Sequence, residues 1–183
     1  MTAKTHASIQ DLYNVPDDGK AEIVNGELVL MSPTGDIPSS AGGAIYASQR
    51  QYQYTTKHGR AYPDNAGFGV DLPNRGSFSP DAAFYEGPRA GGKFLDGAPL
   101  FAAKVRSEGD FGRAAERAMA AKRADYFAAG ALVVWDVDVL RDEIVRVYRA
   151  SDPNQPVLYR RGEIAEAEPA MPGWRMAVED LFA

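Results

Sequence analysis

The sequence predicts a single domain of the α/β or α+β class, in which a central mixed β-sheet is flanked by helices. The chain has 183 residues, 45% of them hydrophobic and 25% charged, which is typical of one globular domain. An Asn-Gly pair joins two apolar runs near the N-terminus, and a strand–helix–strand unit occupies the middle of the chain. We divide the domain into an N-terminal helix and hairpin (1–35), a core (36–150) and a C-terminal strand and tail (151–183).

The elements of the first half are predicted from their caps and turns. Ser8 can cap a short helix that Pro16 stops. Asn25-Gly26 is a strong hairpin turn because both residues tolerate positive φ. His58-Gly59 ends a longer helix. The expected elements are a helix over 8–15, strands over 21–24 and 28–31, a helix from 39 or 40 to 57, and strands over 60–63, 67–72 and 80–85.

The second half contains the strand–helix–strand unit. A loop rich in glycine and proline covers 86–98 and leads into an apolar strand. Gly130 ends the helix that follows, and a second apolar strand comes directly after it. The expected elements are strands over 99–107, 131–136, 143–149 and 157–160, a helix from about 110 or 112 to 129, and a helical turn over 178–182.

Composition excludes several kinds of site. The chain has no cysteine and only two histidines, His6 and His58, so cysteine-ligated metals, thiol nucleophiles and a three-histidine zinc site are excluded. No apolar run is long enough to span a membrane, and we expect a cytoplasmic protein. The net charge of −5 means that any contact with nucleic acid must come from a local basic patch. Chemistry therefore falls to carboxylates, lysines and any metal that they hold.

Lys122 is the first candidate for such chemistry. On a helical projection it lies in the stripe formed by Ala115, Met119 and Tyr126, which is the expected packing face. An ammonium group there needs a carboxylate partner or an opening to a cleft. The alternative is a lysine that reaches past the edge of the core into solvent.

Carboxylates supply the other candidates. Asp81 follows Ser79-Pro80 at the start of a buried strand, where it is either a turn former or an active-site acid. Glu22 and Glu27 lie in the hairpin, where both can simply be solvated. A Lys and an Asp on neighbouring elements would suit phosphodiester hydrolysis, which needs a hard cation such as Mg²⁺ on carboxylate oxygens.

Five stretches of the chain are informative when taken together. They are AEIVNGELVLMSP (21–33), SPDAAFY (79–85), APLFAAKVRS (98–107), AAKRADYFAAGALVVWDVD (120–138) and DEIVRVYR (142–149). In this order they resemble the Uma-two family of the PD-(D/E)XK nuclease superfamily. The resemblance implies a restriction-endonuclease-like core and Mg²⁺-dependent cleavage of nucleic acid, with DNA favoured over RNA, by a homodimer.

Site residues follow from this resemblance one by one. Asp81 matches the metal-binding Asp of the PD strand, and the backbone carbonyl of Val105 would be a further metal ligand. Lys122 matches a lysine that this family carries on the helix. Glu22 matches an N-terminal acid that completes the site, and Glu27 has a recurrent but less defined role.

One position departs from the family pattern. The family strand reads E-V-x-S, whereas this chain has Lys104-Val105-Arg106-Ser107, so a lysine replaces the second metal-binding carboxylate. This exchange removes an oxygen ligand and adds repulsion toward a cation. The candidates to replace that carboxylate are Glu108, Asp110 and Glu116, and each lies poorly for the role.

Two functional hypotheses therefore remain. The first is an Mg²⁺-dependent endonuclease that uses Asp81, Lys122 and Glu22. The second is a catalytically inactive nuclease-fold module for DNA binding or oligomerisation. In that case Lys104, Arg106 and Lys122 would form a compact basic pocket for a phosphate, since Lys104 and Arg106 share one strand face.

Overall fold

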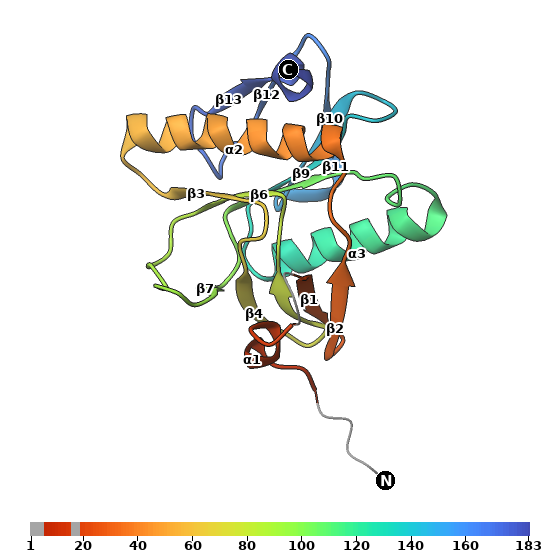
Figure 1. Cartoon of the computed structure of the whole chain (residues 1–183). Coiled ribbons are helices and arrows are strands. Elements are labelled where there is room, and N and C mark those ends of the chain that lie inside the picture. The colour runs from red at the N-terminus through yellow and green to blue at the C-terminus, as the bar shows by residue number, and fades with distance from the viewer. Residues whose placement is uncertain (1–5, 16–18) are drawn as a thin grey trace.

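A six-stranded mixed sheet forms the centre of the computed structural model, which describes residues 6–15 and 19–183 (Figure 1). The strand order is β11-β10-β9-β8-β6-β3. Strands β8 and β9 run parallel, and the other neighbours run antiparallel. The strands are β3 (Arg60–Pro63), β6 (Ala82–Tyr85), β8 (Phe101–Val105), β9 (Val133–Asp138), β10 (Ile144–Arg149) and β11 (Asp152–Arg160).

A five-stranded sheet, in the order β2-β1-β5-β4-β7, contains the N-terminal hairpin. The predicted turn is confirmed: β1 and β2 pair antiparallel, and Asn25 and Gly26 have φ of 50° and 74°. Strand β7 runs parallel to β4. The strands are β1 (Lys20–Val24), β2 (Glu27–Met31), β4 (Phe68–Leu72), β5 (Arg75–Phe78) and β7 (Leu95–Asp96).

Helices and the C-terminal segment cover the six-stranded sheet on both faces. Helix α2 and the C-terminal segment lie on one side and α3 on the other (Figure 1). Among the described residues, no helix has the length and apolar character that a membrane span needs. The remaining elements are α1 (Ile9–Leu12), α2 (Asp36–Thr56), α3 (Arg113–Ala128), β12 (Ile164–Glu166), β13 (Arg175–Ala177) and the 3₁₀ helix η1 (Val178–Phe182).

Two hydrophobic clusters fill the spaces between these layers. The larger one lies under α2 and the C-terminal segment, where the rings of Trp135 and Trp174 are 5.0 Å apart. The smaller one joins the opposite face of the sheet to β4, β5 and α3 through Tyr126, which stacks on Phe78. Because side chains alternate along β8, Ala103 enters the larger cluster and Ala102 the smaller. Lys104 lies on the same face as Ala102 and pairs with Asp81 and Asp110.

The predicted class is confirmed, while several element boundaries differ. The long helix begins at Asp36, earlier than expected, and buries Pro38 in its first turn, which a helix tolerates. Strands β5, β7, β12 and β13 were not predicted, since each has two to four residues. Strand β11 is longer than the predicted 157–160. The predicted helix stop at Pro16 lies outside the described residues.

Candidate functional site

Asp81 lies at the point where β6 begins, and its carboxylate is almost fully buried. Its N–H donates to the carbonyl of Ala103 at 3.0 Å, which extends the pairing of β6 with β8. Its Oδ2 accepts a 2.7 Å hydrogen bond from the N–H of Val105. These two bonds fix the carboxylate against the end of β8, as expected for neighbouring strands.

Two ammonium groups face this carboxylate. Lys104 Nζ is 3.6 Å from Asp81 Oδ2, and Lys20 Nζ is 3.5 Å from Oδ1. Lys104 Nζ also lies 3.0 Å from Asp110 Oδ2, so it bridges two carboxylates, and Lys20 pairs with Asp64. A divalent cation could bridge the same two acids only if the ammonium group moved away.

The protonation of Lys104 follows from these contacts. Burial alone would lower the pKa of Lys104, but the negative charges of Asp81 and Asp110 outweigh this effect and hold the pKa above its ordinary value. Lys104 therefore stays positively charged throughout the neutral range. An ammonium group has no free electron pair and cannot act as a metal ligand.

Glu22 and Lys122 form an ion pair. Lys122 Nζ lies 2.7 Å from Glu22 Oε1, so the partly buried lysine has a carboxylate partner. The same oxygen accepts the N–H of Ser79 at 2.7 Å, and Oε2 accepts Arg75 Nη1 at 3.1 Å. Arg75 in turn pairs with Asp125 at 2.7 Å. Glu22 thus ties β1, β5, α3 and the residues before Asp81 together.

Two buried hydroxyl groups lie near these carboxylates. Ser79 Oγ and Tyr126 Oη have no hydrogen-bond partner among the described residues. Burial, with the negative charges of Glu22 and Asp81, raises the pKa of Tyr126 well above its ordinary value, so its hydroxyl stays protonated. Both hydroxyls remain available to a polar group placed beside the carboxylates.

Arg106 does not join Lys104 in an open basic pocket. It lies just beyond β8 and is almost fully buried. Its guanidinium group forms a two-pronged pair with Asp136, with both N···O distances at 2.6 Å, and a second pair with Glu116. Lys104, Arg106 and Lys122 therefore each have their own carboxylates, and the charge of this region is compensated.

The other sequence candidates are placed differently from one another. Glu27 is exposed at the first residue of β2, and Glu108 is exposed in the loop after β8. The contact of Val105 with Asp81 comes from its N–H group. Asp110 does return to the site, although it lies beyond the strand end, because its carboxylate also accepts the N–H of Ser107 at 2.7 Å.

The donor set does not fit a divalent metal ion. Both oxygens of Asp81 and both oxygens of Glu22 already face cations or N–H donors. Across residues 6–15 and 19–183, no three Asp, Glu or His side chains are grouped so that they could hold a metal. Mg²⁺ needs an octahedral shell of oxygen ligands, and neighbouring ammonium groups would repel it.

Sequence reasoning missed Lys20, Arg75 and Asp136. Lys20 could have been found, because it lies two residues before Glu22 and so shares its strand face. Asp136 pairs in register with Lys104, so its place depends on how two parallel strands align. Arg75 sits in a short strand that follows a turn, and no local pattern marks it.

Comparisons with known proteins agree with this architecture. A family model described as "Uma2: Putative restriction endonuclease" matches residues 7–179. The chain is also similar to a crystal structure from Anabaena variabilis, described as a "putative nuclease belonging to DUF820". The TM-score is 0.75 at 14% identity, over 96% of this chain and 97% of that one. No curated protein matches. Since the family model covers nearly the whole chain, this protein belongs to the Uma2 family of restriction-endonuclease-like proteins.

Proposed function

We propose that this chain is a nucleic-acid-binding member of the nuclease family whose site does not support Mg²⁺-dependent cleavage. The observation behind this proposal is the ammonium group of Lys104 between Asp81 and Asp110. Together with Lys20, it supplies the positive charge that a metal would bring in an active nuclease. Nucleic acid is the ligand class that family membership suggests.

The contacts of Glu22 and Lys122 support a structural role for these two residues, which the resemblance implies are catalytic. Glu22 is saturated by Ser79, Arg75 and Lys122, so its carboxylate holds the hairpin and α3 in place. Lys122 is held by that carboxylate, at a distance typical of a charged hydrogen bond. An active-site lysine would instead need to reach a phosphate.

The alternative is an active endonuclease that uses Asp81, Lys122 and Glu22 with Mg²⁺. The return of Asp110 to the site favours it, since Asp81 and Asp110 would face each other if Lys104 swung out. Three further sequence predictions stay predictions: DNA rather than RNA as the ligand, a homodimer, and a cytoplasmic location.

The deciding experiment compares the unmodified chain with Lys104→Glu and Lys104→Met. We expect no nicking of supercoiled plasmid by the unmodified chain in Mg²⁺ or Mn²⁺. Lys104→Glu restores a carboxylate beside Asp81 and Asp110, so we expect it to bind Mn²⁺ in calorimetry and to nick plasmid. Lys104→Met removes the charge without adding a ligand and is the matched control for metal binding.

Two results would contradict the proposal. Nicking by the unmodified chain that Asp81→Asn abolishes would establish the active endonuclease. Absence of Mn²⁺ binding by a folded Lys104→Glu variant would show that the lysine is not what prevents metal binding.

A further inference from the structure

A pocket of about 410 Å³ lies between the loop that follows β6, the turn between β3 and β4, and the residues after α1. The loop runs from β6 to β7, the small strand at the outer edge in Figure 1. The pocket is lined by aromatic, basic, small and amide residues together with one leucine, Leu95. Those that matter below are Tyr13, Tyr62, Asn65, Arg89, Lys93 and Phe94.

The charge of this pocket is positive and uncompensated. Arg89 and Lys93 are both exposed, and within the described part of the chain neither side chain has an ion-pair or hydrogen-bond partner. The pocket lining contains no carboxylate. Gly91 and Gly92 lie between the two cations, and a side chain on either would meet open space, so their backbone is accessible. In a chain with a net charge of −5, this is a local site for an anion.

Aromatic rings line the same pocket. Tyr13 is 44% exposed, and its ring meets Phe94 edge-on at 5.0 Å. The Tyr13 hydroxyl accepts the N–H of Phe94 at 2.7 Å, which fixes the ring against the loop. Tyr62 is half-buried behind them, edge-on to Phe68 at 6.0 Å. An exposed ring in a fixed position beside cations suits a nucleobase next to a phosphate.

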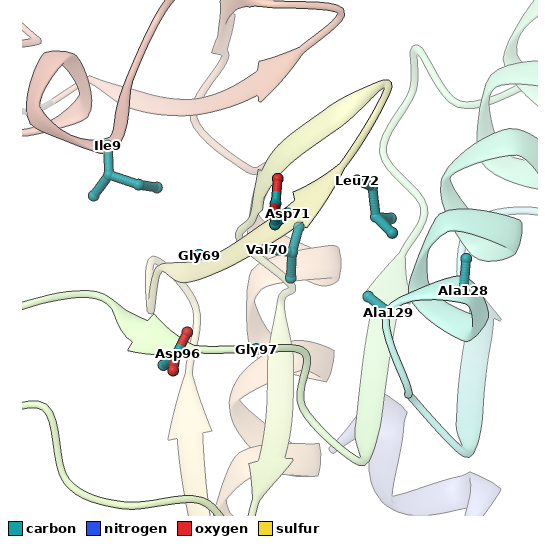
Figure 2. A pocket seen from close by; sticks show the side chains of 9 residues that line it. All are labelled: Ile9, Gly69, Val70, Asp71, Leu72, Asp96, Gly97, Ala128 and Ala129. Carbon is teal, nitrogen blue, oxygen red and sulfur yellow. The ribbon is translucent and has the colours of Figure 1, made fainter.

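A second pocket offers a contrast. It measures about 490 Å³ and lies between β4, β7 and the end of α3 (Figure 2). Its charged residues are Asp71 and Asp96, and its lining includes no cation or aromatic ring. It would repel a phosphate, in contrast to the basic pocket.

We propose that the basic pocket binds one nucleotide of a single-stranded nucleic-acid segment, with the phosphate on Arg89 and Lys93 and the base on Tyr13. This rests on the proposed function and names the surface that would bind the ligand. One residue of the pocket lining, Asn65, follows Asp64, which pairs with Lys20. A duplex keeps its base faces stacked, so the aromatic surface favours a single strand.

The test uses fluorescence anisotropy to measure how tightly the full chain binds a labelled single-stranded DNA of about twelve nucleotides. We expect Arg89→Ala/Lys93→Ala to weaken binding by about tenfold or more, because two phosphate contacts are lost. The slope of log affinity against log salt should fall by about 0.7 in magnitude, because one phosphate of the single strand is no longer neutralised. The matched control is Arg160→Ala/Arg175→Ala, which removes the same charge from exposed arginines of β11 and β13 and should leave affinity nearly unchanged.

A second pair of variants tests the aromatic contact. Tyr13→Ala should weaken binding by about tenfold, within the range measured for base stacking. Tyr13→Phe keeps the ring and should retain most of the affinity, although it loses the hydrogen bond to Phe94. Melting curves confirm that each variant is folded.

The outcomes separate this inference from the proposed function. If the unmodified chain binds and the pocket variant binds equally well, or if both double variants weaken equally, the pocket assignment is wrong while nucleic-acid binding stands. Equal affinity for single-stranded and duplex DNA would overturn the single-strand assignment. If the unmodified chain binds neither DNA nor RNA at low salt, the proposed function itself fails.

Discussion

The cations around Asp81 and those of the basic pocket occupy opposite electrostatic environments. Lys104 bridges two carboxylates, and Arg106 is buried against Asp136 and Glu116. Arg89 and Lys93 are exposed in a loop with no carboxylate in the pocket that they line. The two sets belong to the same molecule and differ in whether carboxylates meet them.

This difference follows from burial. A buried charge costs several kcal/mol, on the order of the whole stability of a domain, unless a partner compensates it. The positive charges near Asp81 are therefore committed to holding the fold together, which leaves little attraction for a phosphate. An exposed charge costs little to leave unpaired, so the open loop can keep cations for a ligand.

The buried pair of Arg106 and Asp136 gives the largest expected effect. Asp136→Ala would leave the arginine with only the half-exposed Glu116, and we expect a loss of about 3–5 kcal/mol in unfolding free energy. In contrast, Arg89→Ala/Lys93→Ala should change stability by about 0.5 kcal/mol or less. Urea denaturation measures both. Similar losses of unfolding free energy in Asp136→Ala and in Arg89→Ala/Lys93→Ala would show that the buried and the exposed cations contribute equally to stability.

Coupling between Asp81 and Lys104 is the next largest effect. Lys104→Met and Asp81→Asn each remove one charge of a pair that is mostly shielded from water, and each should cost about 1–2 kcal/mol. The double variant should be less destabilised than the sum of the two by about 1 kcal/mol, since neither Asp81 nor Lys104 is then left charged without the other. Asparagine still accepts the N–H of Val105, so the backbone contact is kept. Strict additivity would mean that the ammonium group does not compensate Asp81.

The hairpin and α3 could be predicted because their determinants are local. Asn25-Gly26 fixes the turn by its φ preference, and Gly130 follows the last turn of the helix. Strand β7 could not be predicted, because its two residues are held by the backbone of β4 far earlier in the chain. Its pairing is a property of the assembled sheet.

Part of the candidate site could likewise be predicted from the sequence, and part could not. The resemblance singled out Asp81, Lys122 and Glu22, and the structure brings Lys122 to Glu22 and Lys104 to Asp81. The compensation of these charges could not be read from the sequence. Asp110 returns to Lys104 through a turn after the strand. Strand parity correctly put Lys104 and Arg106 on one face, but parity does not reveal which carboxylates meet them.

Removal of the Glu116 charge should give the smallest change in unfolding free energy, because the Glu116 side chain that pairs with Arg106 is 53% exposed. The hydrogen bond from Arg106 holds the pKa of Glu116 below its ordinary value, against a smaller opposing effect of burial. A carboxyl group with a lowered pKa in the fold stabilises it above the unfolded pKa of about 4.5, and this stability is lost as the pH falls through the folded value. Solvent screening limits the contribution to about 0.5 kcal/mol.

The difference in unfolding free energy between the unmodified chain and Glu116→Gln should therefore be present at pH 7 and shrink toward pH 3. If it stayed constant or grew on acidification, Glu116 would not be a charged partner of Arg106, and Asp136 alone would compensate the buried arginine.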